Sequence, residues 1–210
     1  MLKRIARQTT LWISIIALTY SYGCILSPQE DPAPPDNNET AEFMDLTERE
    51  HVITNLVLSY SERNISEFSK LLLKVDDTYN GSTYGDGYYW YNQEGAEGLE
   101  VYILRDVEIN LTGNMFLAAL ETPAKEDHQV LDDLTLDIDP GSWMSVTEIF
   151  DEPCEDCWFT ERPYELEITY GENKKLAYHN VQFYIVPVDE GDLTIYKIAI
   201  AKDIPKSVSP

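Results

Sequence analysis

The motif with the clearest chemistry in this sequence is the pair Cys154 and Cys157, which are separated by Glu155 and Asp156. Such a pair forms a local disulfide, works as a redox centre, or supplies half of a zinc site. The two acids oppose the thiolate that redox chemistry needs, because reactive thiols lie beside positive charge or a helix N-terminus. A zinc site needs further ligands, and the histidines are scattered at His51, His128 and His179. We therefore predict a Cys154–Cys157 disulfide that fixes a turn and does not turn over, with free thiols as the alternative and no metal.

A second group of residues with possible chemistry is aromatic. Between residues 79 and 98, tyrosines and a tryptophan alternate with glycines. Tyrosine and tryptophan offer a flat ring with a polar tip, which suits a stacking surface for a ligand. The alternative, which we favour, is that these rings complete the core at the open end of a sheet. The candidate ligand-lining residues are Tyr84, Tyr88, Tyr89 and Trp90.

The acidic clusters do not match a known ion-binding motif. Residues 132–133, 137–139 and 189–192 are rich in Asp and Glu, but none has the spacing of a calcium-binding loop. The sequence also contains no G-x-S-x-G motif and no phosphate-binding loop. Catalytic residues therefore stay unknown, and we expect no cofactor. An enzyme is not excluded, because catalytic groups assemble in space and not in sequence.

The element that must position these groups is a pair of helices within residues 46–76. Thr47 and Glu50 fit a capping box, which predicts that the first helix begins at Thr47. Its apolar positions favour one buried face, with Asn55 and Ser59 on the solvent side, where truncation should do little. Asn64 predicts the cap of a second helix that runs as far as Asp76. The expected buried residues are Val52, Ile53, Leu56, Val57, Tyr60, Ile65, Phe68, Leu71, Leu72 and Val75.

After residue 107 the apolar pattern changes to a period of two, which is typical of half-buried strands. We expect strands over 107–112 and 134–139, followed by three longer strands over 158–170, 176–188 and 193–201. Gly171 and the acidic run 189–192 separate the last three, which predicts a meander. Residues 122–133 fit either a polar loop or a short helix.

The run LTEREHVITNLVLSYSERNISEFSKLLL resembles the opening of nuclear-transport-factor-2-like (SnoaL-like) domains. The likeness continues in YYWYNQEGAEGLEVYIL, at the place of a third helix, and in GDLTIYKIAIAKD, which is similar to the last strand. The resemblance implies an α+β fold in which N-terminal helices pack on a curved antiparallel sheet and form a cone. It also implies a pocket inside the cone and a tendency to dimerise through the outer face of the sheet.

The N-terminus predicts export. Basic residues precede a ten-residue apolar run over 11–20, which is too short to span a bilayer but suits a signal peptide. Cys24 follows a small residue, as in the lipobox of bacterial lipoproteins, although Ser21 stands where a leucine is usual; an ordinary signal peptide cleaved nearby is the alternative. We predict a signal peptide over 1–23, a lipid-anchored acidic and proline-rich tether over 24–44, one α+β domain over 45–205 and a tail over 206–210.

Without residues 1–23 the chain keeps 12 basic and 38 acidic residues, a net charge of −26. This charge repels nucleic acid and anionic headgroups, so we expect no nucleic-acid partner and membrane association only through the lipid.

Three function classes follow. The first is an envelope lipoprotein, on the periplasmic or surface side, whose noncatalytic domain binds a ligand or partner. The second is a small-molecule enzyme of the isomerase or hydratase type that performs acid–base chemistry in a pocket. The third is a subunit that forms homodimers. A buried carboxyl in an apolar pocket would favour the enzyme, a filled cone the noncatalytic domain, and an exposed aromatic sheet face the dimer.

The lipid anchor gives the first testable prediction. Replacement of the acylated thiol by a hydroxyl, Cys24→Ser, should move the protein from the membrane fraction to the soluble fraction of the envelope. The intact mass of the mature wild-type protein provides the check. A mass that corresponds to an unmodified Cys24, or to cleavage elsewhere, would contradict the prediction.

Overall fold

The structure is a computed structural model that describes residues 42–85, 87–91, 102–118 and 132–204. The predicted signal peptide, Cys24, nearly all of the predicted tether and the tail lie outside these residues. The helices are α2 (Arg49–Ser61), α3 (Ile65–Leu71) and α4 (Arg105–Ala118). The strands are β1 (Thr78–Tyr79), β2 (Ser82–Thr83), β3 (Tyr89–Tyr91), β4 (Tyr102–Leu104), β5 (Asp133–Ile138), β6 (Met144–Ile149), β7 (Glu152–Tyr170), β8 (Asn173–Glu190) and β9 (Leu193–Ile204).

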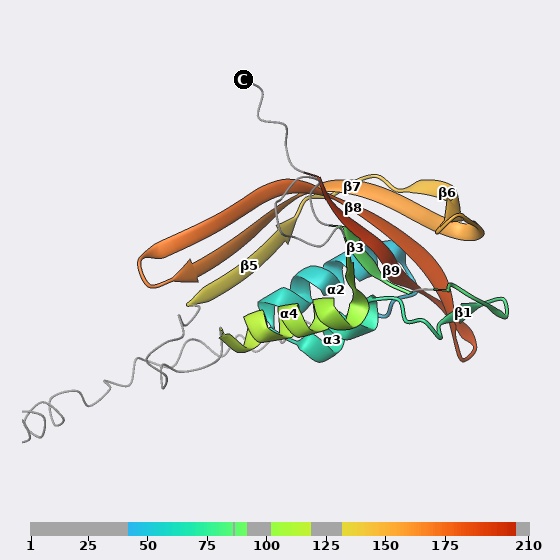
Figure 1. Cartoon of the computed structure of the whole chain (residues 1–210), viewed down its shortest axis with the longest axis horizontal. Coiled ribbons are helices and arrows are strands. Elements are labelled where there is room, and N and C mark those ends of the chain that lie inside the picture. The colour runs from blue at the N-terminus through green and yellow to red at the C-terminus, as the bar shows by residue number, and fades with distance from the viewer. Residues whose placement is uncertain (1–41, 86, 92–101, 119–131, 205–210) are drawn as a thin grey trace, which may run out of the picture. The chain divides into compact units, whose positions relative to one another are not determined.

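One large sheet dominates the domain. Its strand order is β4-β3-β9-β8-β7-β5, and β6 also pairs with β7. The long strands β7, β8 and β9 form an antiparallel meander, as predicted, while β3 joins β9 in parallel. Because β7 is 19 residues long, its first half pairs with β6 and its second half with β5. Figure 1 shows that the sheet formed by these strands is strongly curved.

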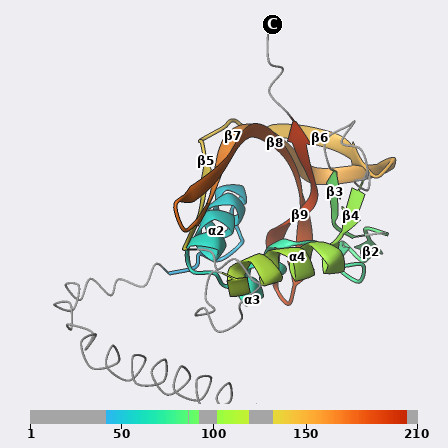
Figure 2. The same cartoon turned by 60° about the vertical axis from the view of Figure 1, so that its left-hand side comes forward.

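The three helices lie in the concave side of this sheet (Figure 2). Helix α2 contacts β5 and β9, and α4 contacts α3, β3 and β4. This arrangement confirms the α+β class and the helices on a curved sheet that the resemblance implies. The apolar residues of α2 and α3 that form the core include Val52, Ile53, Leu56, Phe68, Leu71 and Leu72, all less than 10% exposed.

The predicted capping box at the start of α2 is wrong. The helix begins at Arg49, with Glu48 as the N-cap and no side-chain cap. The Thr47 hydroxyl instead donates to the carboxylate of Asp45, 2.5 Å away, and the backbone N–H of Thr47 donates to the same oxygen. The capping box would need Glu50 to accept from the Thr47 backbone N–H, but both oxygens of the Glu50 carboxylate accept from Arg162, and Asp45 takes the Thr47 N–H instead.

The predicted solvent face of α2 is also wrong at two positions. Asn55 and Ser59 are 3% and 0% exposed. The Asn55 amide accepts from the backbone N–H of Met44 and donates to its carbonyl, at 2.9 and 2.7 Å. Asn55 thus holds the segment before the helix, and its truncation would remove both hydrogen bonds to the Met44 backbone. The Ser59 hydroxyl donates to the carbonyl of Leu56.

The cap of the second helix is confirmed, because the Asn64 side chain accepts from the backbone N–H of Glu67. The predicted end of this helix is wrong. Helix α3 stops at Leu71, and the chain extends alongside β9, where the backbone N–H of Leu73 donates to the carbonyl of Ile198. Val75, which we predicted to be buried, is 64% exposed.

Two further predictions are corrected. Residues 107–112 belong to helix α4 and not to a strand. The helical spacing was present in the sequence, since the buried residues Thr112 and Phe116 are four positions apart. Conversely, Tyr89–Tyr91 and Tyr102–Leu104, where a third helix was expected, form the paired strands β3 and β4. The strand predicted over 134–139 is confirmed as β5, and most of the undecided stretch 122–133 lies outside the described residues.

An ion pair between the buried Arg162 and the half-exposed Glu50 links α2 to β7. Arg162 is 1% exposed, and its guanidinium donates two hydrogen bonds of 2.7 Å to the two carboxylate oxygens of Glu50. Trp143 donates to the same carboxylate. The side chain fits only because residue 141 is glycine, where a Cβ atom would lie 2.8 Å from Cγ of Arg162.

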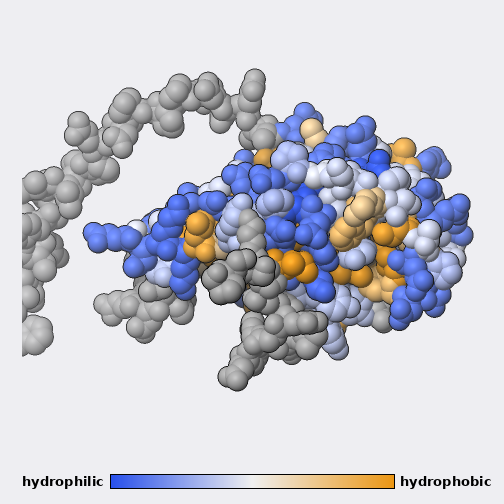
Figure 3. All heavy atoms as spheres, turned by 90° about the horizontal axis from the view of Figure 1, so that it is seen from above, coloured by the Kyte–Doolittle hydropathy of each residue, from blue (hydrophilic) through white to orange (hydrophobic). Residues whose placement is uncertain are grey.

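The face of the domain seen from above in Figure 3 is mostly hydrophilic, with hydrophobic residues in separate groups. Among the described residues, no helix is long and apolar enough to cross a membrane.

The Arg162–Glu50 pair predicts a pH dependence of stability. The hydrogen bonds from Arg162 hold the pKa of Glu50 below its usual value of about 4.5. A lowered pKa stabilises the fold above the unfolded-state pKa, and this stabilisation is lost as the pH falls through the folded-state pKa. Glu50→Gln should therefore lower the free energy of unfolding by about 1 kcal/mol at pH 7, because Arg162 stays buried without its counterion while solvent screens the half-exposed Glu50.

Below pH 4 the difference between Glu50→Gln and the wild type should shrink, which urea titrations at several pH values would measure. The matched control is Glu62→Gln, at the exposed C-cap of the same helix. An equal loss of stability at pH 3 and pH 7 would contradict the assignment.

Candidate functional site

The concave side of the sheet encloses a cavity of about 290 Å³ between the sheet and all three helices. Its volume is at the small end of the usual range of about 300–1,000 Å³ for ligand sites. The lining is mostly apolar and includes six aromatic residues. The lining residues are Leu56, Tyr60, Phe68, Leu72, Tyr88, Trp90, Ile103, Glu108, Leu111, Thr112, Met115, Leu136, Ile138, Tyr164, Leu166, Val181, Phe183, Ile198 and Ala201.

Helix α4 places the polar groups of this cavity. Glu108, Leu111, Thr112 and Met115 follow the i, i+3, i+4, i+7 spacing, so they share one face of the helix and that face lines the cavity. The side chain of Arg105 fixes the start of the helix, because it donates to the carbonyls of Ser69 and Leu72.

Glu108 is the only acidic residue among the described residues of the lining. One carboxylate oxygen accepts a hydrogen bond of 3.1 Å from the Thr112 hydroxyl, one turn later. Burial raises the pKa of Glu108, because the apolar surroundings disfavour the charged form. Such a carboxyl is a stronger base once ionised, and it is a proton donor when protonated.

Two phenols face this carboxyl from other elements. Burial raises the pKa of Tyr60 on α2 and of Tyr88 before β3, and the charge of Glu108 raises both further. Both hydroxyls thus keep their protons and offer hydrogen bonds inside the cavity.

A second polar cluster begins at the cavity wall. The hydroxyl of Tyr164 on β7 donates to the carboxylate of Asp203 on β9, at 3.3 Å. The same carboxylate lies 3.0 Å from Nδ1 of His179 on β8, and since a carboxylate only accepts, Nδ1 carries the proton. His179 and Asp203 do not line the cavity themselves. Burial, followed by the charge of Asp203, raises the pKa of Tyr164.

The four aromatic candidates from the sequence separate in space. Tyr88 and Trp90 line the cavity. Tyr84 instead donates its hydroxyl to the carbonyl of Pro187, and Tyr89 packs against Phe150 and Tyr102. Gly87 sets the direction of Tyr88, because its φ of +79° and its close approach to Val75 leave little room for a side chain.

Sequence reasoning missed Glu108, Thr112 and Tyr164. Glu108 and Thr112 are four residues apart, which is a helical spacing. The alternation of apolar and polar residues over 107–112 suggested a strand instead. Tyr164 carried no sequence signal, since its role comes from the pairing of β7 with β8 and of β8 with β9.

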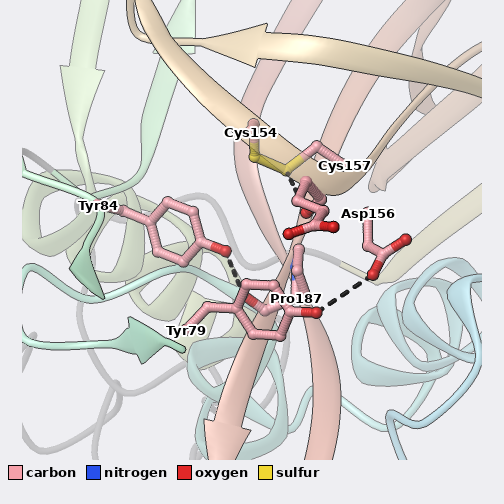
Figure 4. Close-up of a disulfide and its surroundings, with 7 residues drawn as sticks. Tyr79, Tyr84, Cys154, Asp156, Cys157 and Pro187 are labelled. Atoms are coloured by element: carbon pink, nitrogen blue, oxygen red, sulfur yellow. Dashed lines mark hydrogen bonds between the residues drawn. A yellow bond between two sulfur atoms is a disulfide. The ribbon is translucent and has the colours of Figure 1, made fainter. Parts of the chain in front are cut away.

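Figure 4 shows the surroundings of Cys154 and Cys157, which a disulfide joins at the start of β7, with Cα atoms 5.8 Å apart. The predicted turn is wrong: both cysteines lie within β7, where its pairing with β6 shifts register. Asp156, between the two cysteines, has a φ of +58° and accepts from the Tyr79 hydroxyl of β1. The disulfide-bridged segment of β7 and the β1–β2 hairpin form walls of a groove of about 640 Å³. Among the described residues, no three potential ligands are arranged to hold a metal ion.

The comparisons with known proteins concern the fold. No protein-family model and no curated protein matches the sequence. A solved NTF2-like superfamily protein from Salmonella enterica is similar at 10% identity over 75% of this chain and 89% of its own, with a TM-score of 0.44. A candidate dehydratase of the NTF2-like family from Streptomyces avermitilis is similar at 10% identity over 74% and 92%, with a TM-score of 0.45.

Both similar structures belong to the family that the sequence resembles. With TM-scores below 0.5, neither likeness carries an argument about activity or site residues. The class of protein is therefore defined by the structure itself, as an α+β domain with a cavity between its curved sheet and its helices.

The disulfide leads to a prediction about its redox state. Alkylation of the denatured, unreduced protein should label neither Cys154 nor Cys157, because the disulfide leaves no free thiol on either residue. The double variant Cys154→Ser/Cys157→Ser should melt only slightly lower, since the bridge closes a very short loop and the chain-entropy gain is small. Labelling of both thiols would contradict the disulfide. Stoichiometric zinc in the purified protein would indicate a metal site in its place.

Proposed function

We propose that this protein is exported, anchored to the cell envelope by a lipid on Cys24, and that its domain binds a small, largely apolar molecule inside the cone. The observation that carries the binding function is the cavity of about 290 Å³, whose described lining includes six aromatic residues and the carboxyl of Glu108. This is not the filled cone expected of a noncatalytic partner-binding domain. Binding of a small molecule is common to a binding domain and an enzyme, and the buried carboxyl is the feature that favours the enzyme. Apolar lining with few polar groups is the usual composition of small-molecule sites.

The proposed anchor agrees with a binding role near a membrane. Residues 24–44 hold proline and acidic residues and few apolar ones, and such a segment forms an extended tether. The domain would then remain close to the bilayer, where small apolar molecules concentrate, while its negative charge keeps it off anionic headgroups.

Acid–base catalysis is the second candidate function, and Glu108 favours it. A carboxyl whose pKa is raised by burial titrates closer to neutral pH, which is what a general acid or base requires. The protonated phenols of Tyr60 and Tyr88 would stabilise negative charge that develops on a substrate. Proton transfer between carbon and a carboxylate, as in isomerases and hydratases, is the chemistry that this set supports.

The binding function predicts the effect of a cavity-filling variant. Met115→Trp should reduce the affinity for a neutral ring compound such as 2-naphthylmethanol by at least about tenfold, because the indole occupies the lined space. Leu117→Trp is the control, since Leu117 lies on the same helix and is 56% exposed. Isothermal titration calorimetry and thermal melting of all three proteins would measure affinity and folding. Equal affinities in both variants and the wild type would contradict the proposal, as would no binding to the wild type.

The enzyme candidate predicts base catalysis on a generic carbon acid. With 5-nitrobenzisoxazole, whose ring opens when a base removes its proton, the wild type should accelerate opening by about 10²-fold or more over solution. The rate should rise as the pH passes through the pKa of Glu108, and Glu108→Gln should abolish the acceleration while the affinity for 2-naphthylmethanol persists. An unchanged rate in Glu108→Gln would exclude this candidate.

A further inference from the structure

The charge inside the cavity is unbalanced. Glu108 is acidic, and among the described lining residues none is lysine, arginine or histidine. The nearest basic residue in the sequence, Arg105, is engaged with two backbone carbonyls and with Asp106. The single polar contact recorded for the carboxylate within the described part of the chain is the Thr112 hydroxyl. A partly buried carboxylate with so few partners raises the free energy of the folded state, because it has lost water without gaining a counterion. A bound cation would supply that counterion.

The walls of the cavity suit a cation as well. The rings of Tyr60, Phe68, Tyr88, Trp90, Tyr164 and Phe183 line it. The face of an aromatic ring carries partial negative charge, so it attracts an ammonium group, and more strongly where water is excluded. An anionic ligand would be repelled by the carboxylate of Glu108.

We propose that the cavity takes a small apolar amine, whose ammonium group pairs with the Glu108 carboxylate while its apolar body packs against the aromatic walls. This inference rests on the proposed binding function and names the class of ligand for that site. An ammonium group offers three donors, of which one bonds the carboxylate oxygen that Thr112 leaves open. A single ring or a short chain fits the volume of about 290 Å³.

Amine binding is coupled to the protonation of Glu108. Among the described lining residues, the titratable groups on other elements are the phenols of Tyr60, Tyr88 and Tyr164, and the residues from β5, β8 and β9 are apolar. Burial raises the pKa of Glu108 in the empty cavity. An ammonium group favours the charged carboxylate, so at a pH below that pKa the amine must displace a proton.

The test compares three ligands that differ mainly in charge. Calorimetry with the full chain at pH 8 should give 2-phenylethylamine an affinity at least tenfold higher than 2-phenylethanol, and 3-phenylpropanoate the weakest. As the pH falls through the pKa of Glu108, the amine affinity should fall while that of the alcohol stays constant. Titrations in two buffers of different ionisation enthalpy should show proton release in this range.

Glu108→Gln should lower the amine affinity at least tenfold and change that of the alcohol by less than about threefold, with no pH dependence. Gln keeps the size of the side chain and an acceptor for Thr112, so the variant should fold. Asp106→Asn is the control, because it removes the same charge from α4 at a side chain that is 90% exposed.

The outcomes distinguish a failure of the amine proposal from a failure of the proposed binding function. If 2-naphthylmethanol binds in a manner that Met115→Trp blocks, but the amine has no advantage over the alcohol in the wild type, the amine proposal is overturned and the binding function stands. Equal amine affinity in Glu108→Gln and wild type overturns it too. If no neutral ligand binds, the binding function itself fails.

Discussion

The buried guanidinium of Arg162 is the constraint on which the rest of this domain depends. It lies in the bend of β7, between the residues that pair with β6 and those that pair with β5. Its two hydrogen bonds to Glu50 fix the first turn of α2 against that bend. A charge buried to this degree is tolerated only when its donors are satisfied, so helix and sheet are held in one relative position. The same pair explains why Glu50 does not cap its own helix.

The position of α2 in turn determines the cavity. Leu56 and Tyr60 follow Glu50 along the helix and form one wall, while the curved strands form the opposite wall. Lys197 and Asp77, which are 7% and 11% exposed, add a second ion pair that fixes the chain after α3 to β9. An interior cavity costs stability, and so does a carboxyl without a counterion. Proteins retain such destabilising features mainly at functional sites. The functional proposals are therefore based on the cavity and on Glu108.

The groove beside the disulfide has a different character. It lies between the β1–β2 hairpin and the segment of β7 bridged by Cys154 and Cys157, and it is lined by tyrosines together with Glu152 and Glu155. The hydrogen bond from Tyr79 to Asp156 links the two walls. The aromatic and glycine-rich segment that begins at residue 79 therefore contributes to two places: Tyr79 and Tyr84 line this groove, whereas Tyr88 and Trp90 line the cavity.

The sequence by itself determined the α+β class, the Asn64 cap, the strands β5, β8 and β9, and β7 from Trp158 onward, because these depend on local periodicity and on side chains that bond their own neighbours. The start of β7, where a turn was predicted, is formed by pairing with β6. Tertiary contacts decided three other features. Asn55 is buried because its amide bonds the backbone of Met44, and α3 ends at Leu71 because the chain after it pairs with β9. Residues 105–118 form a helix and not a strand, and positions 108, 112 and 115 of this helix line the cavity. The site belongs to this second group. Glu108 and Thr112 share a helix, but Tyr60, Tyr88 and Tyr164 reach them only when the sheet curves around the helices. A sequence records which residues are neighbours along the chain, whereas a cavity is made by residues that meet across it.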